Sequence, residues 1–246
     1  MRGRLGAYLL RFQLWDFLFL RAALPAGLVI FFIWMIVKTD GSRYDFATPE
    51  GGRFAKNLFT TFAPVFVNLA AFLGVTRLVT DDRSNGYFRF LFSKPVNIER
   101  FYVQQWVMHG VVYVAIVGAL TWWLQLYTAP IPVLEVMIVM GLFWVLFGGI
   151  GFALTAATNF DALLLVAVWV ASTVMHSLKD APNSPMWGWM QQVTRLMPPT
   201  HKLDYIKAEL YAGNPMPMTH LTHVLAYGAI GFAVAVVLLR RTSLAR

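Results

Sequence analysis

Apolar residues gather in six stretches along the chain, each about as long as a membrane helix. They cover residues 17–37, 58–76, 103–124, 133–156, 161–178 and 220–239. A helix that crosses the hydrocarbon core of a bilayer needs about 20 mostly apolar residues. The pattern therefore predicts an all-α, polytopic membrane protein, in which residues 1–246 form a single transmembrane domain of six helices.

The composition supports lipid as the solvent for most of the chain. Hydrophobic residues make up 58% and charged residues 13%, against about 25% charged in a soluble domain. These values exclude a disordered chain, a coiled coil and an ordinary soluble domain. The absence of cysteine excludes disulfides and thiolate metal sites. The net charge of +8 is typical of a membrane protein that contacts anionic lipid headgroups, and we expect no nucleic-acid partner.

The N-terminal region is expected to begin on the membrane surface. Residues 4–16 alternate apolar and polar positions at helical spacing, which predicts an interfacial helix or an extension of the first span. Arg21 lies near the start of that span, where its side chain can reach the headgroups. Lys38 follows the span without a small-residue cleavage site, which favours an anchor over a signal peptide.

The basic residues are unevenly divided between the two sides of the predicted membrane. One side carries the larger share: Arg2, Arg4, Arg11, Arg21, Arg77, Arg83, Arg89, Lys94, Arg100, Arg240, Arg241 and Arg246. The other carries Lys38, Arg43, Arg53, Lys56, Lys179, Arg195, Lys202 and Lys207. By the positive-inside rule, the first side is cytoplasmic and both termini lie inside, in a multi-pass protein of the cell inner membrane.

Between the fifth and sixth spans, residues 184–213 predict two short amphipathic helices on the outer face. Pro198 and Pro199 end the first helix, Thr200 is the expected N-cap of the second, and Gly213 ends it. Neither helix is long enough to cross the membrane. Within the fourth span, Gly149, Ala153 and Ala157 recur every four residues, which predicts a face for close helix packing.

Between the second and third spans lies a loop that is both highly charged and rich in apolar residues. Its charged residues begin at Asp81, and Pro95 ends a short helix. The apolar residues within that helix are Tyr87, Phe88, Phe90, Leu91 and Phe92. A polar linker would not carry them, so the pattern favours docking onto a cytoplasmic partner over a simple connection.

This loop resembles the cytoplasmic loop of type 2 ABC export permeases. The residues that carry the resemblance are Asp82, Arg83, Gly86, Leu91, Ser93, Pro95 and Val96. The chain departs from the family pattern at Ile98, where an arginine is usual, since Arg100 lies two positions later. It also has Tyr87 where threonine is frequent. The family further shares six spans, an interfacial first helix and short helices before the last span.

The resemblance implies a permease subunit that moves its substrate by alternating access. The helix over residues 82–93 would be the coupling helix, on which a separate cytoplasmic ABC ATPase subunit docks. The implied docking residues are Asp82, Arg83, Gly86, Tyr87, Phe88, Arg89, Leu91, Ser93, Pro95 and Val96.

Two ATPase copies and a second permease subunit, identical or different, would complete the transporter. The pathway would then run between the permease subunits, lined mainly by spans one, two and five. The chain contains no phosphate-binding loop motif. It is therefore expected to have no enzymatic activity and no bound cofactor of its own, with ATP and Mg²⁺ bound by the partner.

A few polar residues inside the predicted spans are candidate pathway residues. Asn68, His109 and Glu135 could contact substrate, or form interhelical hydrogen bonds or an interfacial acid. Because polar residues inside membrane helices can also conduct ions, an ion-coupled secondary transporter is an alternative function. Histidines and methionines near the outer face leave a membrane component of a copper-handling assembly as another, although no metal site is predicted. The aromatic spans suit an amphipathic substrate, and the sequence does not identify it.

Overall fold

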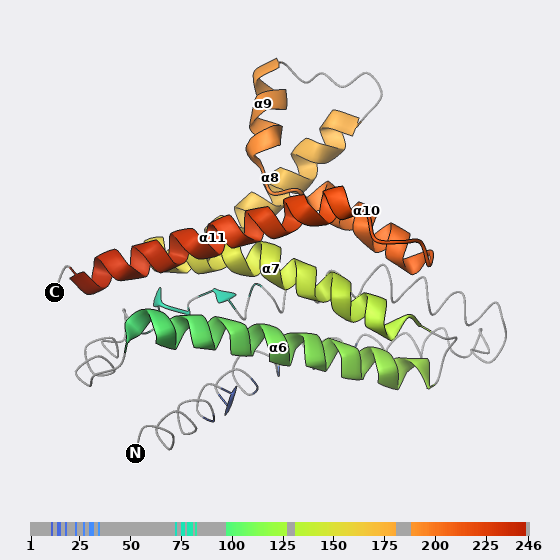
Figure 1. Ribbon diagram of the computed structural model, residues 1–246, viewed down its shortest axis with the longest axis horizontal. Helices are drawn as coiled ribbons and strands as arrows, with labels where there is room; N and C mark the ends of the chain where they lie inside the picture. The colour runs from blue at the N-terminus through green and yellow to red at the C-terminus, as the bar shows by residue number, and fades with distance from the viewer. Residues whose placement is uncertain are drawn as a thin grey trace. The chain divides into compact units, whose positions relative to one another are not determined.

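The computed structural model of the chain describes residues 97–126, 131–180 and 188–244, together with single positions between residues 11 and 82 (Figure 1). Those positions are residues 11, 14, 15, 18, 23, 27, 30, 31, 34, 72, 75, 76, 78, 79, 80 and 82. Within this part, the chain is helical and contains no strand. The continuous segments form α6 (Ile98–Gln125), α7 (Val133–Ala157), α8 (Asp161–Asp180), α9 (Gly188–Leu196), α10 (Thr200–Tyr211) and α11 (Met218–Leu244).

Four of the described helices are long and apolar enough to cross a membrane. Their spanning segments are Ile98–Trp123, Val133–Ala157, Asp161–Lys179 and Met218–Arg241. Helices of this kind are therefore confirmed at the predicted third to sixth spans. The predicted spans at 17–37 and 58–76, the interfacial helix at 4–16 and the coupling helix at 82–93 lie outside the described residues, apart from single positions. The count of six spans stays a prediction.

Contacts divide the chain into two compact units, and each is described by itself. The first comprises Met1–Gly74 and Gln104–Gly141, and the second comprises Val75–Val103 and Leu142–Arg246. Both α6 and α7 contribute residues to both units. The single membrane domain stays a prediction.

In the first unit, α6 and α7 run antiparallel. The side chain of Met137 fills the space beside Gly118, and Gly141 lies near Val114. Thr121 is buried and its hydroxyl donates to the carbonyl of Val117 at 2.7 Å. That bond satisfies a polar group which would otherwise be costly inside a membrane helix.

In the second unit, α7 and α11 run parallel and their backbones touch. A Cβ atom at Gly149 would collide with the carbonyl oxygen of Gly228, and one at Gly228 would collide with the carbonyl oxygen of Val145. The rings of Phe152 and Phe232 pack one step further along, with centroids 5.7 Å apart. Lipid tails are as apolar as leucine, so close approach at small residues is the main attraction between membrane helices.

The predicted packing face on α7 is correct at Gly149 but does not extend to Ala157, which is exposed. A spacing of four residues advances about 40° around a helix at each step, because 3.6 residues complete a turn. Two such steps move Ala157 well away from the line that faces α11.

The two predicted short helices are present as α9 and α10. α10 ends as predicted at Gly213, whose φ of 78° is left-handed and suits glycine. The amides of Gly213 and Asn214 donate to the carbonyls of Leu210 and Glu209 at 3.1 and 3.0 Å. This pair of bonds is the Schellman arrangement for a helix end.

The prediction that Thr200 is the N-cap of α10 is wrong. Thr200 is the first helical residue, and Pro199 occupies the cap position with no side-chain cap bond. The hydroxyl of Thr200 lies instead 3.2 Å from that of Ser172 on α8. The Ser172 hydroxyl donates to the carbonyl of Pro198 at 2.7 Å. The start of α10 is thus set by a tertiary contact that propensity does not reveal.

Replacing Gly228 by valine is expected to force α7 and α11 apart, because its Cβ would meet the backbone of Val145. Overpacking costs about 1–3 kcal/mol, so the thermal unfolding midpoint in detergent should fall by roughly 2–10 °C. Gly188→Ala is the matched control, since nothing lies within 4 Å of a Cβ there. An unchanged midpoint for Gly228→Val would contradict the close crossing.

Candidate functional site

Two described residues, Asp82 and Asn97, lie at the two ends of the predicted docking loop. Each is bonded to the start of α6. Asp82 is half-buried, and its Oδ2 accepts a hydrogen bond of 2.9 Å from the hydroxyl of Tyr102. Tyr102 itself is fully buried. A hydrogen bond from a buried phenol to a carboxylate is charge-assisted and fixes the orientation of both groups. The start of the loop is therefore anchored to the second turn of α6.

The other end of the loop is anchored by Asn97, the N-cap of α6. Its Oδ1 accepts from the backbone amide of Arg100 at 3.0 Å, and its carbonyl accepts from the amide of Phe101 at 3.0 Å. Asparagine is among the best N-caps because its side chain satisfies an amide that has no partner within the helix. Glu99 lies in the first turn, where a negative charge suits the helix dipole.

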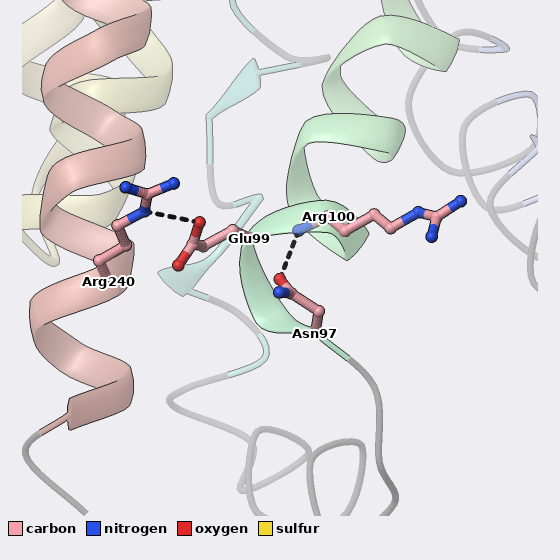
Figure 2. A network of polar contacts seen from close by, with 4 residues as sticks. All are labelled: Asn97, Glu99, Arg100 and Arg240. Atoms are coloured by element: carbon pink, nitrogen blue, oxygen red, sulfur yellow. Dashed lines mark hydrogen bonds and ion pairs between the residues drawn. The ribbon is translucent and has the colours of Figure 1, made fainter.

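An ion pair joins this first turn of α6 to the last turns of α11. The Nε of Arg240 lies 2.8 Å from Oε2 of Glu99, as Figure 2 shows. The Arg240 side chain is 64% exposed and that of Glu99 is 23% exposed. Arg100 points away from this pair in Figure 2. An ion pair this exposed contributes about 0–1 kcal/mol to stability, so its main effect is to fix position.

Threonines join the segment before the loop to the end of α7. The amide of Val79 donates to the hydroxyl of Thr155 at 3.2 Å. The hydroxyl of Thr80 lies 3.2 Å from the carbonyl oxygen of Thr155 and 3.1 Å from that of Thr158. Thr155 is fully buried. Together, Asp82, Asn97, Glu99, Tyr102, Arg240 and the Thr80–Thr155 contact form what we call the loop base.

Of the predicted docking residues, Asp82 alone is among those described. Residues Arg83, Gly86, Tyr87, Phe88, Arg89, Leu91, Ser93, Pro95 and Val96 lie outside the described residues, as does Asn68. The structure brings Asp82 together with Tyr102. Tyr102 is not among the site residues predicted from the sequence. Arg100, whose equivalence to the family arginine the sequence leaves open, is exposed in the first turn of α6.

The two other candidate pathway residues belong to the first unit. His109 is fully buried near the middle of α6. Glu135 is half-buried in the first turn of α7. Gln105, one turn before His109, is also buried, and its Oε1 has no hydrogen-bond partner within the described part of the chain. These side chains are polar groups on helices long enough to cross a membrane.

Two histidines, His176 on α8 and His201 on α10, stack on each other. The rings of His176 and His201 have centroids 4.1 Å apart and planes inclined by 29°. His176 Nδ1 lies 2.8 Å from the carbonyl oxygen of Ser172. Metal-binding lone pairs lie in the plane of an imidazole ring, so stacked rings do not converge on one ion. Among the described residues, no group of three or more His, Cys, Asp or Glu side chains could hold a metal.

Comparison with known protein families finds no family model that matches the chain. Comparison with curated proteins likewise finds no match.

Asn97→Ala is expected to fray the first turn of α6 by removing the cap bond to Arg100. The loss of such a cap costs about 1 kcal/mol, which corresponds to a roughly fivefold faster amide hydrogen exchange at Arg100 and Phe101, whose amides donate to Asn97. Asn97→Ser keeps a capping oxygen and serves as the control. Equal exchange in the alanine and serine variants would show that the cap does not hold this end of the loop.

Proposed function

We propose that the chain is the transmembrane permease subunit of an ATP-driven ABC exporter of type 2. The resemblance of residues 82–96 to the coupling loop of that family is the starting point. The observation that carries the proposal furthest is the loop base. A loop that receives force from a docked partner needs both ends attached to the helices that move. Here Asp82 is bonded to Tyr102, and Asn97 begins the same helix.

The arrangement of the helices supports the proposal. Four helices are long and apolar enough to cross a membrane, and two short helices, α9 and α10, lie between the last two. The resemblance implies short helices at this place in the chain. α10 packs on both α8 and α11, so the short helices belong to the same unit as the loop base.

In this proposal, ATP and Mg²⁺ are bound by a separate cytoplasmic subunit, and this chain contributes no catalytic residue. Two ATPase copies close on ATP and push on the coupling helices of two permease subunits. The permeases then alternate between inward-open and outward-open states around an amphipathic substrate. The loop base lies on the cytoplasmic side of the inner membrane, with both termini inside.

A second candidate function, ion-coupled secondary transport, is favoured by one observation. His109 and Gln105 are buried side by side along α6, which is long and apolar enough to cross a membrane. Ionisable or strongly polar groups inside membrane helices are often part of proton or ion pathways. An ion-coupled transporter requires no ATPase partner. A test for a co-purifying ATPase therefore separates this candidate from the ABC exporter.

The proposal predicts that an ATPase subunit co-purifies with the tagged chain from mild detergent, as identified by mass spectrometry. The double variant Gly86→Pro/Leu91→Asp should reduce its recovery at least tenfold, because it breaks the loop helix and charges its apolar face. Leu196→Asp on α9 is the matched control, since Leu196 is exposed and far along the sequence from the loop.

Recovery of the ATPase with the wild type and Leu196→Asp, and its loss from the loop variant, would support the proposal. If no ATPase accompanies the wild type, the proposal is wrong. Transport driven by a proton gradient in liposomes, compared with a His109→Gln variant, then tests the second candidate.

A further inference from the structure

α11 contacts the loop base, α7 and both short helices. It runs from Met218 to Leu244 without a break, a length of about 40 Å at 1.5 Å per residue. All of these contacts lie within the second unit. α11 therefore reaches from the loop base near its C-terminal end to α9 near its middle and α10 near its N-terminal end.

The first contact is the ion pair between Arg240 and Glu99 (Figure 2). Glu99 lies two residues after Asn97, the cap that follows the loop. A displacement of this turn of α6 would thus reach α11 directly. Next to Arg240, Leu239 is fully buried, which keeps this part of α11 packed against its unit.

The second contact, in the middle of α11, prevents the helix from bending freely. Gly228 and Gly231 would otherwise be places where a helix bends easily. Both glycines are instead pressed against the backbone of α7, around Val145 and Gly149. Val224, Ala235 and Leu239 are fully buried on either side of them. The same close crossing holds the middle of α11 against α7.

The third contact holds the short helices. The ring of His220 stacks on that of Tyr205 of α10, with centroids 4.8 Å apart. The hydroxyl of Tyr227 donates to the carbonyl of Arg195 of α9 at 3.2 Å. Both residues lie in the first three turns of α11. α10 is therefore attached near the N-terminal end of α11, and α9 is attached beside Gly228, near the middle of the helix.

We infer that α11 is a rigid link that carries a displacement of the loop base to α9 and α10, with the Glu99–Arg240 pair as its attachment. Because the Arg240 side chain of that pair is 64% exposed, removal of the pair changes the stability of the unit little. Its removal takes away the ion pair between Glu99 and α11, while Leu239 and the two glycines stay packed. Because α11 is continuous, the resulting change alters how firmly Tyr205 and Arg195 are held further along the helix. The inference rests on contacts inside this chain and holds whichever partner docks on the loop.

Amide hydrogen exchange of the purified full chain in lipid nanodiscs tests the link. Glu99→Gln and Arg240→Gln are each expected to raise exchange at least threefold in α9 and α10, in addition to residues 97–103. Residues 111–125 and 133–141 of the other unit should keep their wild-type rates. Arg241→Gln is the matched control: it removes the same charge from the next residue, which has no ion pair among the described residues.

The double variant Glu99→Gln/Arg240→Gln completes a double-mutant cycle. If both residues act through one ion pair, its exchange matches that of either single variant. Unchanged exchange in α9 and α10, an equal rise in Arg241→Gln, a rise over the whole chain, or fully additive effects would each overturn the inference. No ATPase or substrate is present in this experiment, so its outcome is separate from that of the proposed function.

Discussion

The second unit depends on the direct contact between the backbones of α7 and α11. Gly149 and Gly228 leave no side chain between the two helices, and Gly231 continues the contact at 2.8 Å between its missing Cβ position and the Gly149 carbonyl carbon. In lipid there is little hydrophobic gain from burying an apolar side chain against another helix, so dispersion at close range must hold such helices together. Fixing α11 on α7 also fixes Arg240 beside Glu99 near the C-terminal end of the helix and Tyr227 beside α9 next to Gly228.

The contact between α7 and α11 also determines where Arg240 lies in the loop base. The described residues on either side of residues 83–96 are Asp82, which is bonded to Tyr102 near the start of α6, and Asn97, which caps that helix. The bonds involved are of different strength. The charge-assisted bond to buried Tyr102 is the stronger one, whereas the Glu99–Arg240 pair, with Arg240 64% exposed, contributes little to stability and mainly fixes position. The loop base therefore holds Asp82 and Asn97, the described residues on either side of the predicted docking loop, at the start of α6.

Local pattern was sufficient to predict α7, α8 and the end of α10 at Gly213, because composition and turn chemistry act within a few residues. It failed at Thr200, whose hydroxyl lies beside Ser172 instead of capping its own helix. The Asn97 cap was missed although an Asn directly before an apolar helix with an early Glu is a recognisable start signal. The Glu99–Arg240 and Thr80–Thr155 contacts could not be predicted from one sequence, because each joins segments far apart in the chain.

The central claim is that an ATPase docks on the loop, and a photo-crosslinking amino acid at Phe88 tests it most directly in native membranes. The account predicts one dominant protein crosslink, to a subunit that carries an ATP-binding motif, whose yield changes when Mg-ATP is added. The same probe at Trp189, an exposed residue of α9, should not capture that subunit. Crosslinks from Phe88 to lipid alone, or the same protein captured from both positions, would contradict the account.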